Sequence, residues 1–132
     1  MRYYEEDEMQ MMYVRCFNEC WSQYSRLLHH AANEGNGNIR RGARNKRMGV
    51  QAGFPDLMLH VARGGYHGFG IELKRKGGRQ QPNQIEMQEL LEKQGYKYVV
   101  CRSLASFMDN IEEYLGEKTS NVYWNALRKE LR

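Results

Sequence analysis

Residues 53–76 read GFPDLMLHVARGGYHGFGIELKRK and decide the fold of this chain. Apolar side chains occupy alternate positions in two runs, residues 57–61 and residues 69–73, with Gly64-Gly65 between them. Alternation with a period of two is typical of a strand that buries one face, and a glycine pair is typical of a tight turn. The stretch therefore predicts a β-hairpin, whose register only a bulge would shift.

Regular pairing about Gly64 gives three opposed pairs: Leu57 with Ile71, Leu59 with Phe69, and Asp56 with Glu72. Because side chains alternate between the faces of a strand, Asp56, Glu72 and Lys74 share the face that the apolar residues leave free. Two opposed carboxylates repel each other, so a cation between them is expected. Mg²⁺ fits, since it needs only one or two protein carboxylates. Lys74 is a second source of positive charge. The alternative to a metal site is a solvated face on which these three residues form ordinary surface ion pairs.

Length and composition predict one domain. The 132 residues are 41% apolar, which is enough for a core of their own but not for a second domain. A net charge of +4 and a pI near 9.0 favour a polyanionic partner. No apolar run approaches the roughly 18 to 20 residues of a membrane span, and Met1-Arg2 leads into an acidic segment rather than a signal peptide. We therefore expect a single domain, residues 1–132, in the cytosol.

The elements around the hairpin follow from periodicity and from glycine content. Apolar positions at three- and four-residue steps predict helices over residues 5–32, 82–94, 103–115 and 117–132. Residues 98–101 read as a short buried strand. Residues 33–53 contain five glycines and are expected to form a loop, with a short strand near residues 48–51. The order indicates an α/β domain with a helix, a three-stranded portion that contains the hairpin, a crossover helix, a fourth strand and a further helix.

Basic side chains gather in two groups, one within the predicted loop and one after the hairpin. The residues that we expect to contact the polyanionic partner are Arg40, Arg41, Arg44, Lys46 and Arg47 in the loop, and Lys76 and Arg79 after the hairpin. Guanidinium groups bind phosphate oxygens in a bidentate fashion, and the glycines between them let a backbone approach a phosphate chain. A solvated run of charges is the alternative interpretation of the loop group.

Pro55-Asp56 followed by Glu72-Leu73-Lys74 resembles the PD-(D/E)XK signature of the restriction-endonuclease-like nucleases. A wider set resembles the VRR-NUC group, the virus-type replication-repair nuclease domain, over about residues 5–115. This set comprises Asn33-Glu34-Gly35, Gly49, Gly53-Phe54-Pro55-Asp56-Leu57, Ile71-Glu72-Leu73-Lys74, Gly78-Arg79 and Gln84. The resemblance implies an α/β/α core with a mixed β-sheet and a metal-dependent hydrolysis of DNA.

The resemblance also implies roles for the residues of the signature. Asp56, Glu72 and the backbone carbonyl of Leu73 would hold one or two Mg²⁺ or Mn²⁺ ions. Lys74 would position the attacking water or stabilise the developing negative charge. A polar amide at Gln84, on the inward face of its helix, would orient a phosphate or a water beside the active site.

The N-terminal helix is expected to supply a further acidic residue. Glu6 stands four residues before Gln10, which matches the spacing of the group, so Glu6 is the candidate catalytic residue and metal ligand. Glu5 and Glu8 are its rivals. Favourable electrostatics at the start of a helix is the alternative reason for acidic residues here.

The expected function is that of an Mg²⁺- or Mn²⁺-dependent endodeoxyribonuclease that cuts branched DNA. Stand-alone members of the group act on four-way junctions, whose resolution needs two symmetric nicks, so a homodimer is expected. Its interface candidate is the stripe Tyr123, Trp124, Leu127 and Leu131, and packing of this stripe on residues 103–115 of the same chain is the alternative. A non-catalytic DNA-binding module and an RNA-processing nuclease on the same fold are the other functions open to this sequence.

Overall fold

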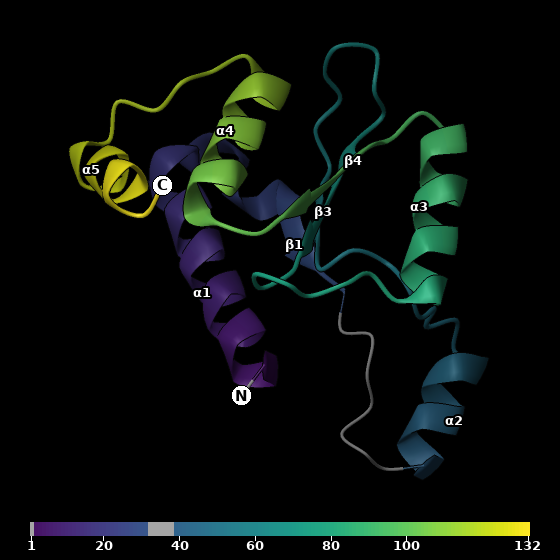
Figure 1. The fold of residues 1–132 in the computed structure, drawn as a ribbon. Helices are drawn as coiled ribbons and strands as arrows, with labels where there is room; N and C mark the ends of the chain where they lie inside the picture. Colours follow the sequence, from purple (N-terminus) through teal and green to yellow (C-terminus); the bar gives the residue numbers. More distant parts are fainter. Residues whose placement is uncertain (1, 32–38) are drawn as a thin grey trace.

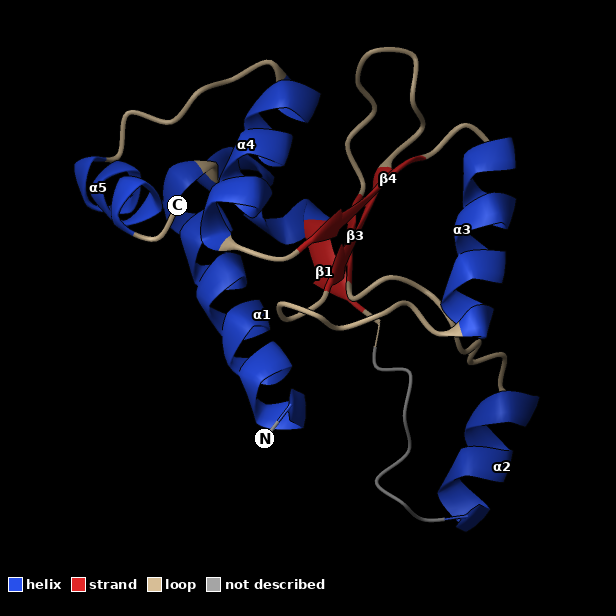
Figure 2. Ribbon diagram, in the orientation of Figure 1, coloured by secondary structure: helices blue, strands red, loops and turns tan. Residues whose placement is uncertain are grey.

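A four-stranded mixed β-sheet forms the centre of the computed structural model, which describes residues 2–31 and 39–132 (Figures 1 and 2). The strand order is β1-β2-β3-β4, with these bounds: β1 Leu28–His30, β2 Leu57–Leu59, β3 Phe69–Leu73 and β4 Lys97–Cys101. The first three strands are antiparallel, and β4 runs parallel to β3. A crossover through a helix joins β3 to β4, as a parallel pair requires.

The predicted hairpin is confirmed, including its register. Leu57 pairs with Ile71 and Leu59 pairs with Phe69. Gly64 and Gly65 make the turn with φ values of 56° and 86°. Two successive left-handed residues match the right-handed twist of the flanking strands, and only glycine adopts this backbone without a steric cost.

Helices cover both faces of the sheet. Figure 1 shows α1 (Arg2–Cys20), α4 (Leu104–Leu115) and α5 (Val122–Glu130) on one side, and α3 (Pro82–Lys93) on the other. The α/β/α layering and the mixed sheet confirm the predicted fold class. Helices were correctly predicted at residues 82–94 and 103–115. Ser103 caps the N-terminus of α4, and Gly116, whose φ is 70°, caps its C-terminus.

The core lies between the sheet and the layer of α1 and α4. The six apolar residues of the hairpin face it, as predicted: Leu57, Leu59, Val61, Phe69, Ile71 and Leu73. Tyr13 stacks on Phe107 across the two helices, with ring centroids 5.0 Å apart. This packing fixes the hairpin on its apolar face and leaves its polar face directed toward α3.

The prediction of one helix over residues 5–32 is wrong in its second half. The α-helix ends at Cys20, a 3₁₀-helix follows at Ser22–Leu27, and residues 28–30 form β1. Leu28 pairs with Leu59, so β1 covers an edge of β2 that would otherwise expose its hydrogen-bonding groups. Pairing with a strand that lies about thirty residues later in the chain overrides the helical periodicity.

The prediction of a loop over residues 33–53 is also wrong in part. Residues 39–47 form a helix, α2 (Ile39–Arg47), because arginine, alanine and lysine are good helix formers and the single interior Gly42 costs only about 1 kcal/mol. Residues 48–51 lie in a turn and the irregular segment after it rather than in a strand, since β1 already occupies that edge of β2. Asn33 and Glu34 lie outside the described residues.

The C-terminal helix packs on its own chain. Trp124 is buried in the common core, and its indole N–H donates to Glu19 Oε1 of α1 at 2.7 Å. Leu127 packs against the same core, whereas Tyr123 and Leu131 are exposed. Trp124 and Leu127 therefore follow the alternative that we gave for this stripe, which is packing within the same chain rather than in a dimer interface. Within the described ranges, no helix is long and apolar enough to cross a membrane.

Candidate active site

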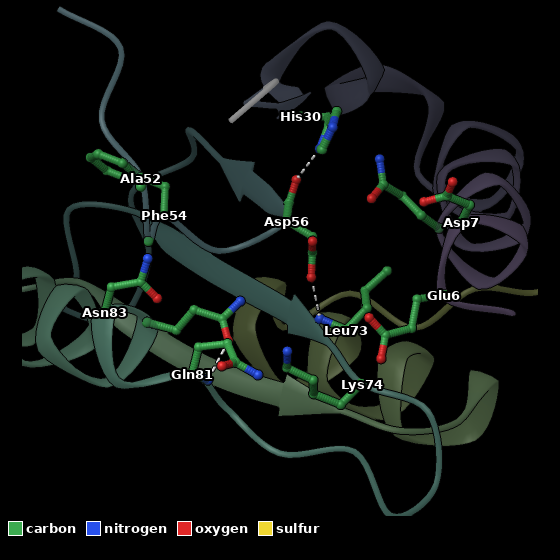
Figure 3. A pocket seen from close by; sticks show the side chains of 13 residues that line it. Glu6, Asp7, His30, Ala52, Phe54, Asp56, Leu73, Lys74, Gln81 and Asn83 are labelled. Atoms are coloured by element: carbon green, nitrogen blue, oxygen red, sulfur yellow. Dashed lines mark hydrogen bonds between the residues drawn. The ribbon is translucent and has the colours of Figure 1, made fainter. Parts of the chain in front are cut away.

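A pocket of about 350 Å³ opens at the edge of the sheet where β2 begins and β3 ends (Figure 3). Asp56, Leu73 and Lys74 lie at its centre, Glu6 reaches it from α1, and Gln84 reaches it from the first turn of α3. The structure thus brings together five of the six residues that the sequence assigned to catalysis and metal binding. Glu72, the sixth, is fully buried and does not line the pocket; its Oε2 lies 3.8 Å from Nζ of the pocket residue Lys74.

Asp56 stands directly before β2, where its carboxylate reaches across to the end of β3. Oδ2 accepts a hydrogen bond from the backbone N–H of Leu73 at 2.7 Å. Burial raises the pKa of Asp56, the nearby charge of Glu72 adds to this rise, and the Leu73 hydrogen bond opposes it. A cation beside the Asp56 carboxylate would therefore stabilise its charged form.

The backbone carbonyl of Leu73 points toward the same side. Lys74 N–H donates to Cys101 of β4 at 3.0 Å, so the backbone groups of Leu73, one residue earlier, point away from β4. The Leu73 N–H already meets Asp56 on that side. The carbonyl of Leu73 is therefore available to the pocket beside the Asp56 carboxylate.

Glu72 presents one satisfied oxygen and one unsatisfied oxygen. Oε1 accepts hydrogen bonds from the Tyr98 hydroxyl and from Gln80 Nε2, the latter at 3.2 Å. Oε2 is buried and has no hydrogen-bond partner among the residues that the structure describes. Lys74 Nζ lies 3.8 Å from Oε2 and gives it charge compensation without a hydrogen bond. A buried oxygen in this state is costly, and it is a ready ligand for a cation.

Glu6 is the glutamate of α1 that faces the pocket. Its Oε2 accepts from the backbone N–H of Arg75 at 3.3 Å, next to the end of β3. Glu5 lies 4.0 Å from the Arg75 guanidinium, and both Glu5 and Glu8 line a separate hollow between α1 and the residues that follow β3. Of the three glutamates, Glu6 alone lines the pocket that contains Asp56.

Gln84 has a local structural task as well as a place in the pocket. Its Oε1 accepts from the backbone N–H of Gln81 at 2.7 Å, while Gln81 caps the helix in return. This reciprocal pair is a capping box, which satisfies free N–H groups at the start of α3. Because its oxygen is used there, the side-chain NH₂ of Gln84 is the group left to donate to a substrate.

The VRR-NUC domain model matches residues 3–105, a range that runs from α1 into the start of α4 and contains every residue of this pocket. The chain belongs to the VRR-NUC domain family. A solved structure described as a VRR_NUC domain protein is similar at 32% sequence identity, with a TM-score of 0.70, and the match covers 86% of this chain and 90% of that chain. No curated protein matches the chain. The fold is thus that of a nuclease-type domain.

The basic residues of this VRR-NUC domain lie on two segments that continue into residues of the pocket lining. Three on α2 are exposed, namely Arg44, Lys46 and Arg47, and residues 48–54 lead from this helix to the pocket wall. Lys76 and Arg79 are exposed in the turn after β3. Arg40 and Arg41 belong to α2, but their side chains lie outside the described part of the chain. Arg102, which sequence reasoning missed, donates to the carbonyls of Arg75 and Gly78 and holds this turn in place.

The donor set of the VRR-NUC pocket fits Mg²⁺ or Mn²⁺. Three oxygen donors are available: a carboxylate oxygen of Asp56, Glu72 Oε2 and the Leu73 carbonyl. The described residues contain no group of three or more His, Cys, Asp or Glu side chains arranged to hold a metal ion. Mg²⁺ does not need such a group, because it binds through one or two carboxylates and completes its octahedron with water and substrate phosphate. The unsatisfied Glu72 Oε2 is the observation that favours a cation here.

Several residues of the site were missed by sequence reasoning. His30 was assigned to a helix; in β1, its Nδ1 lies 2.7 Å from the Asp56 carbonyl and its ring lines the pocket. Asp7 also lines the pocket, one residue after Glu6. Tyr98 and Gln80 contact Glu72 from 26 and 8 residues away. A signal for Tyr98 was present, since it alternates with the core residue Cys101 and so faces α3 on the predicted strand.

Proposed function

We propose that this VRR-NUC domain is an Mg²⁺- or Mn²⁺-dependent endonuclease that hydrolyses phosphodiester bonds in DNA. The observation that carries the proposal is Glu72 Oε2, a buried carboxylate oxygen without a hydrogen-bond partner in the described part of the chain. It lies 3.8 Å from Nζ of Lys74, which lines the same pocket as Asp56. A DNA-binding module has no use for this pair of carboxylates, because both repel phosphate. A cation removes the repulsion and makes the pair useful.

Asp56, Glu72 and the Leu73 carbonyl would hold the ion, and Glu6 faces the same pocket from α1. When bound, the ion polarises the phosphoryl oxygen and makes a coordinated water more acidic. Lys74 is 7% exposed and its ammonium lies in the pocket wall, where low dielectric strengthens its interaction with negative charge. Its role would be to position the attacking water or to stabilise the charge that develops on the phosphoryl oxygens, since its Nζ is a hydrogen-bond donor that lies beside Glu72.

The substrate path follows the basic segments. The exposed cations of α2 and of residues 76–79 lie within a few residues in sequence of residues that line the pocket. Each phosphate that they neutralise releases counterions and adds affinity. The Gln84 NH₂ group donates to a phosphate oxygen next to the scissile bond. We propose that the substrate is branched DNA, in particular a four-way junction.

Two cuts in one junction require two active sites, because the chain carries a single set of Asp56, Glu72 and Lys74. We therefore propose that the domain acts as a homodimer on this substrate. Two-fold dimers are the commonest closed assembly and hold two sites at a fixed separation. The dimer contact must exclude Trp124 and Leu127, which pack inside the protomer.

The function is tested with labelled single strand, duplex, flap, splayed-arm and four-way-junction DNA and a matched RNA, each incubated with protein in Mg²⁺ and in chelator. Wild-type protein should cut the junction in Mg²⁺ alone, and Asp56→Ala, Glu72→Ala and Lys74→Ala should each abolish cutting while DNA binding persists. Glu8→Ala is the matched control, because Glu8 lies on α1 outside the pocket. Undiminished cutting by Glu72→Ala, or cutting in chelator, would refute the metal-dependent assignment. Faster cutting of RNA would reassign the substrate.

The assembly is tested by light scattering of the free protein and of its junction complex. A dimer mass in the complex, with paired nicks in a plasmid-borne junction, is the expected result. A protein mass of about 16 kDa in both samples would refute the dimer and leave the nuclease assignment standing.

A further inference from the structure

Tyr98 donates a hydrogen bond to Glu72, and the pairing of β4 with β3 makes this contact possible. Tyr98 pairs with Gly70 across the parallel β3–β4 ladder, and it is buried. A Cβ atom at Gly70 would lie 3.2 Å from Tyr98 Cδ2 and 3.0 Å from Pro55 Cγ. The missing side chain therefore makes space for the tyrosine ring to lie over Gly70. From there the hydroxyl reaches Glu72, two residues further along the same face of β3.

Gln80 makes the second contact from the opposite direction. It lies in the segment before α3, and its Nε2 donates both to Glu72 Oε1 at 3.2 Å and to Gln88 Oε1 at 2.9 Å. Gln88, on α3, donates in turn to Glu92 at 3.3 Å. Because both partners of Gln80 are acceptor oxygens, the amide group must present its NH₂ end to Glu72. Helix α3 thus fixes the orientation of this donor.

The two donors converge on the same oxygen of Glu72. Oε1 receives both hydrogen bonds, and Oε2 receives none from the described residues. Two neutral donors hold the carboxylate group in one orientation without neutralising its charge. If they were only satisfying a buried carboxylate, a donor on each oxygen would be the less costly arrangement.

We infer that Tyr98 and Gln80 are positioning residues that hold Glu72 through Oε1 and leave Oε2, which faces Lys74 Nζ at 3.8 Å without a hydrogen bond, as a one-oxygen ligand for the catalytic cation. This inference rests on the proposed function, since it assigns a purpose to the free oxygen. Neither residue touches the substrate or the ion; each acts through Glu72. Partners that orient a metal ligand typically contribute about 10- to 100-fold in metal affinity or activity.

The test is the affinity for Mn²⁺ in the absence of DNA, measured from the signal of free Mn²⁺ in electron paramagnetic resonance. Tyr98→Phe keeps the ring over Gly70 and removes only the hydroxyl, so Mn²⁺ should bind about 10- to 100-fold more weakly. Tyr96→Phe is the matched control, since the Tyr96 hydroxyl makes no hydrogen bond within the part of the chain that the structure describes. Its Mn²⁺ affinity should equal that of wild type.

A second variant guards against a folding defect in the first. Gln80 is half-buried in a loop. Gln80→Met keeps the length of the side chain and removes the N–H donor. This variant should weaken Mn²⁺ binding in the same way as Tyr98→Phe. For both variants, kcat at limiting Mn²⁺ should fall while KM for DNA stays the same, and excess Mn²⁺ should restore kcat. Loss of packing alone would not be rescued by metal.

The outcomes separate this inference from the proposed function. If wild type binds Mn²⁺ and Glu72→Gln does not, but both Tyr98→Phe and Gln80→Met bind within twofold of wild type, the positioning role is wrong and the metal site stands. If wild type itself binds no Mn²⁺, the proposed function and the inference both fail. Weakened binding in the two variants, with Tyr96→Phe unaffected, establishes the positioning role.

Discussion

Replacing Asp56 by asparagine should stabilise the metal-free protein. Asparagine keeps the oxygen that accepts the hydrogen bond from Leu73 N–H, which is 2.7 Å long in the structure. It removes a charge that is disfavoured by burial and by the neighbouring charges of Glu72 and Glu6. Relief of a destabilised active-site group commonly yields about 0.5 to 2 kcal/mol. A lost hydrogen bond would cost about 1 kcal/mol in the other direction, so retention of this bond decides the sign.

The pH dependence of this gain follows from the direction of the pKa shift. Folding raises the pKa of Asp56 above its ordinary value of 3.8, so the folded protein holds this proton more tightly than the unfolded chain does. Below that value the residue is protonated in both states, and the variant has no electrostatic advantage. As the pH rises through the raised pKa of the folded state, wild type loses stability at this residue and the advantage of asparagine grows to its full size.

The assay is urea denaturation followed by circular dichroism, at pH 8 and at pH 4, with EDTA or with Mn²⁺. In EDTA at pH 8 the Asp56→Asn variant should be the more stable protein. Mn²⁺ at 100 times its Kd should then add about 2.7 kcal/mol to wild type and almost nothing to the variant, which reverses the order. A variant that is less stable than wild type in EDTA at pH 8 would refute the reasoning, as would equal Mn²⁺ stabilisation of both proteins.

Three further predictions concern the DNA surface, the C-terminal helix and the acidic residues of α1. Replacing the three exposed cations of α2, Arg44, Lys46 and Arg47, by alanine should lower the slope of log affinity against log salt concentration by about 2.7. The reason is that each phosphate contact on duplex DNA contributes about 0.9 to this slope. An unchanged slope would show that α2 is a solvated helix that does not contact DNA. Trp124→Ala should lower the free energy of unfolding, measured by urea denaturation, by about 3 to 5 kcal/mol, because the ring is buried. Tyr123 is exposed, so Tyr123→Ala should stay within about 0.5 kcal/mol of wild type. Equal costs would mean that α5 is not packed on α1 as the structure has it. Glu6→Gln should reduce junction cleavage by about 10- to 100-fold, and Glu8→Gln should leave it intact; the opposite ranking would show that the site uses another glutamate.

Local pattern was sufficient to predict the hairpin and its polar face. Leu57 and Ile71 are joined by a short connection with a glycine turn, so alternation and turn chemistry together fix their register. Asp56, Glu72 and Lys74 then fall on one face by geometry alone. Helix α4 was predictable for a similar reason, because Ser103 and Gly116 mark its ends with standard capping residues.

Long-range pairing decided what the sequence left open. Residues 28–30 carry no alternation strong enough to compete with the helical pattern before them, and they become β1 only because β2 offers a free edge. Tyr98 reaches Glu72 through the register of a parallel pair, which a crossover helix sets and no local signal specifies. Trp124 has the spacing of an interface anchor, and only the position of α1 shows that its partner is Glu19 of the same chain.

We propose that Asp56, Glu72 and the Leu73 carbonyl share one divalent cation. The most direct test of this proposal is a crystal of the protein soaked in Mn²⁺, with anomalous diffraction data collected to locate the ion. We expect a single strong peak within about 2.0 to 2.3 Å of an Asp56 carboxylate oxygen, Glu72 Oε2 and the Leu73 carbonyl oxygen, with the hydrogen bonds to Glu72 Oε1 intact. A peak elsewhere in the pocket without a bond to Glu72, or no peak at Mn²⁺ concentrations that support cleavage, would contradict it.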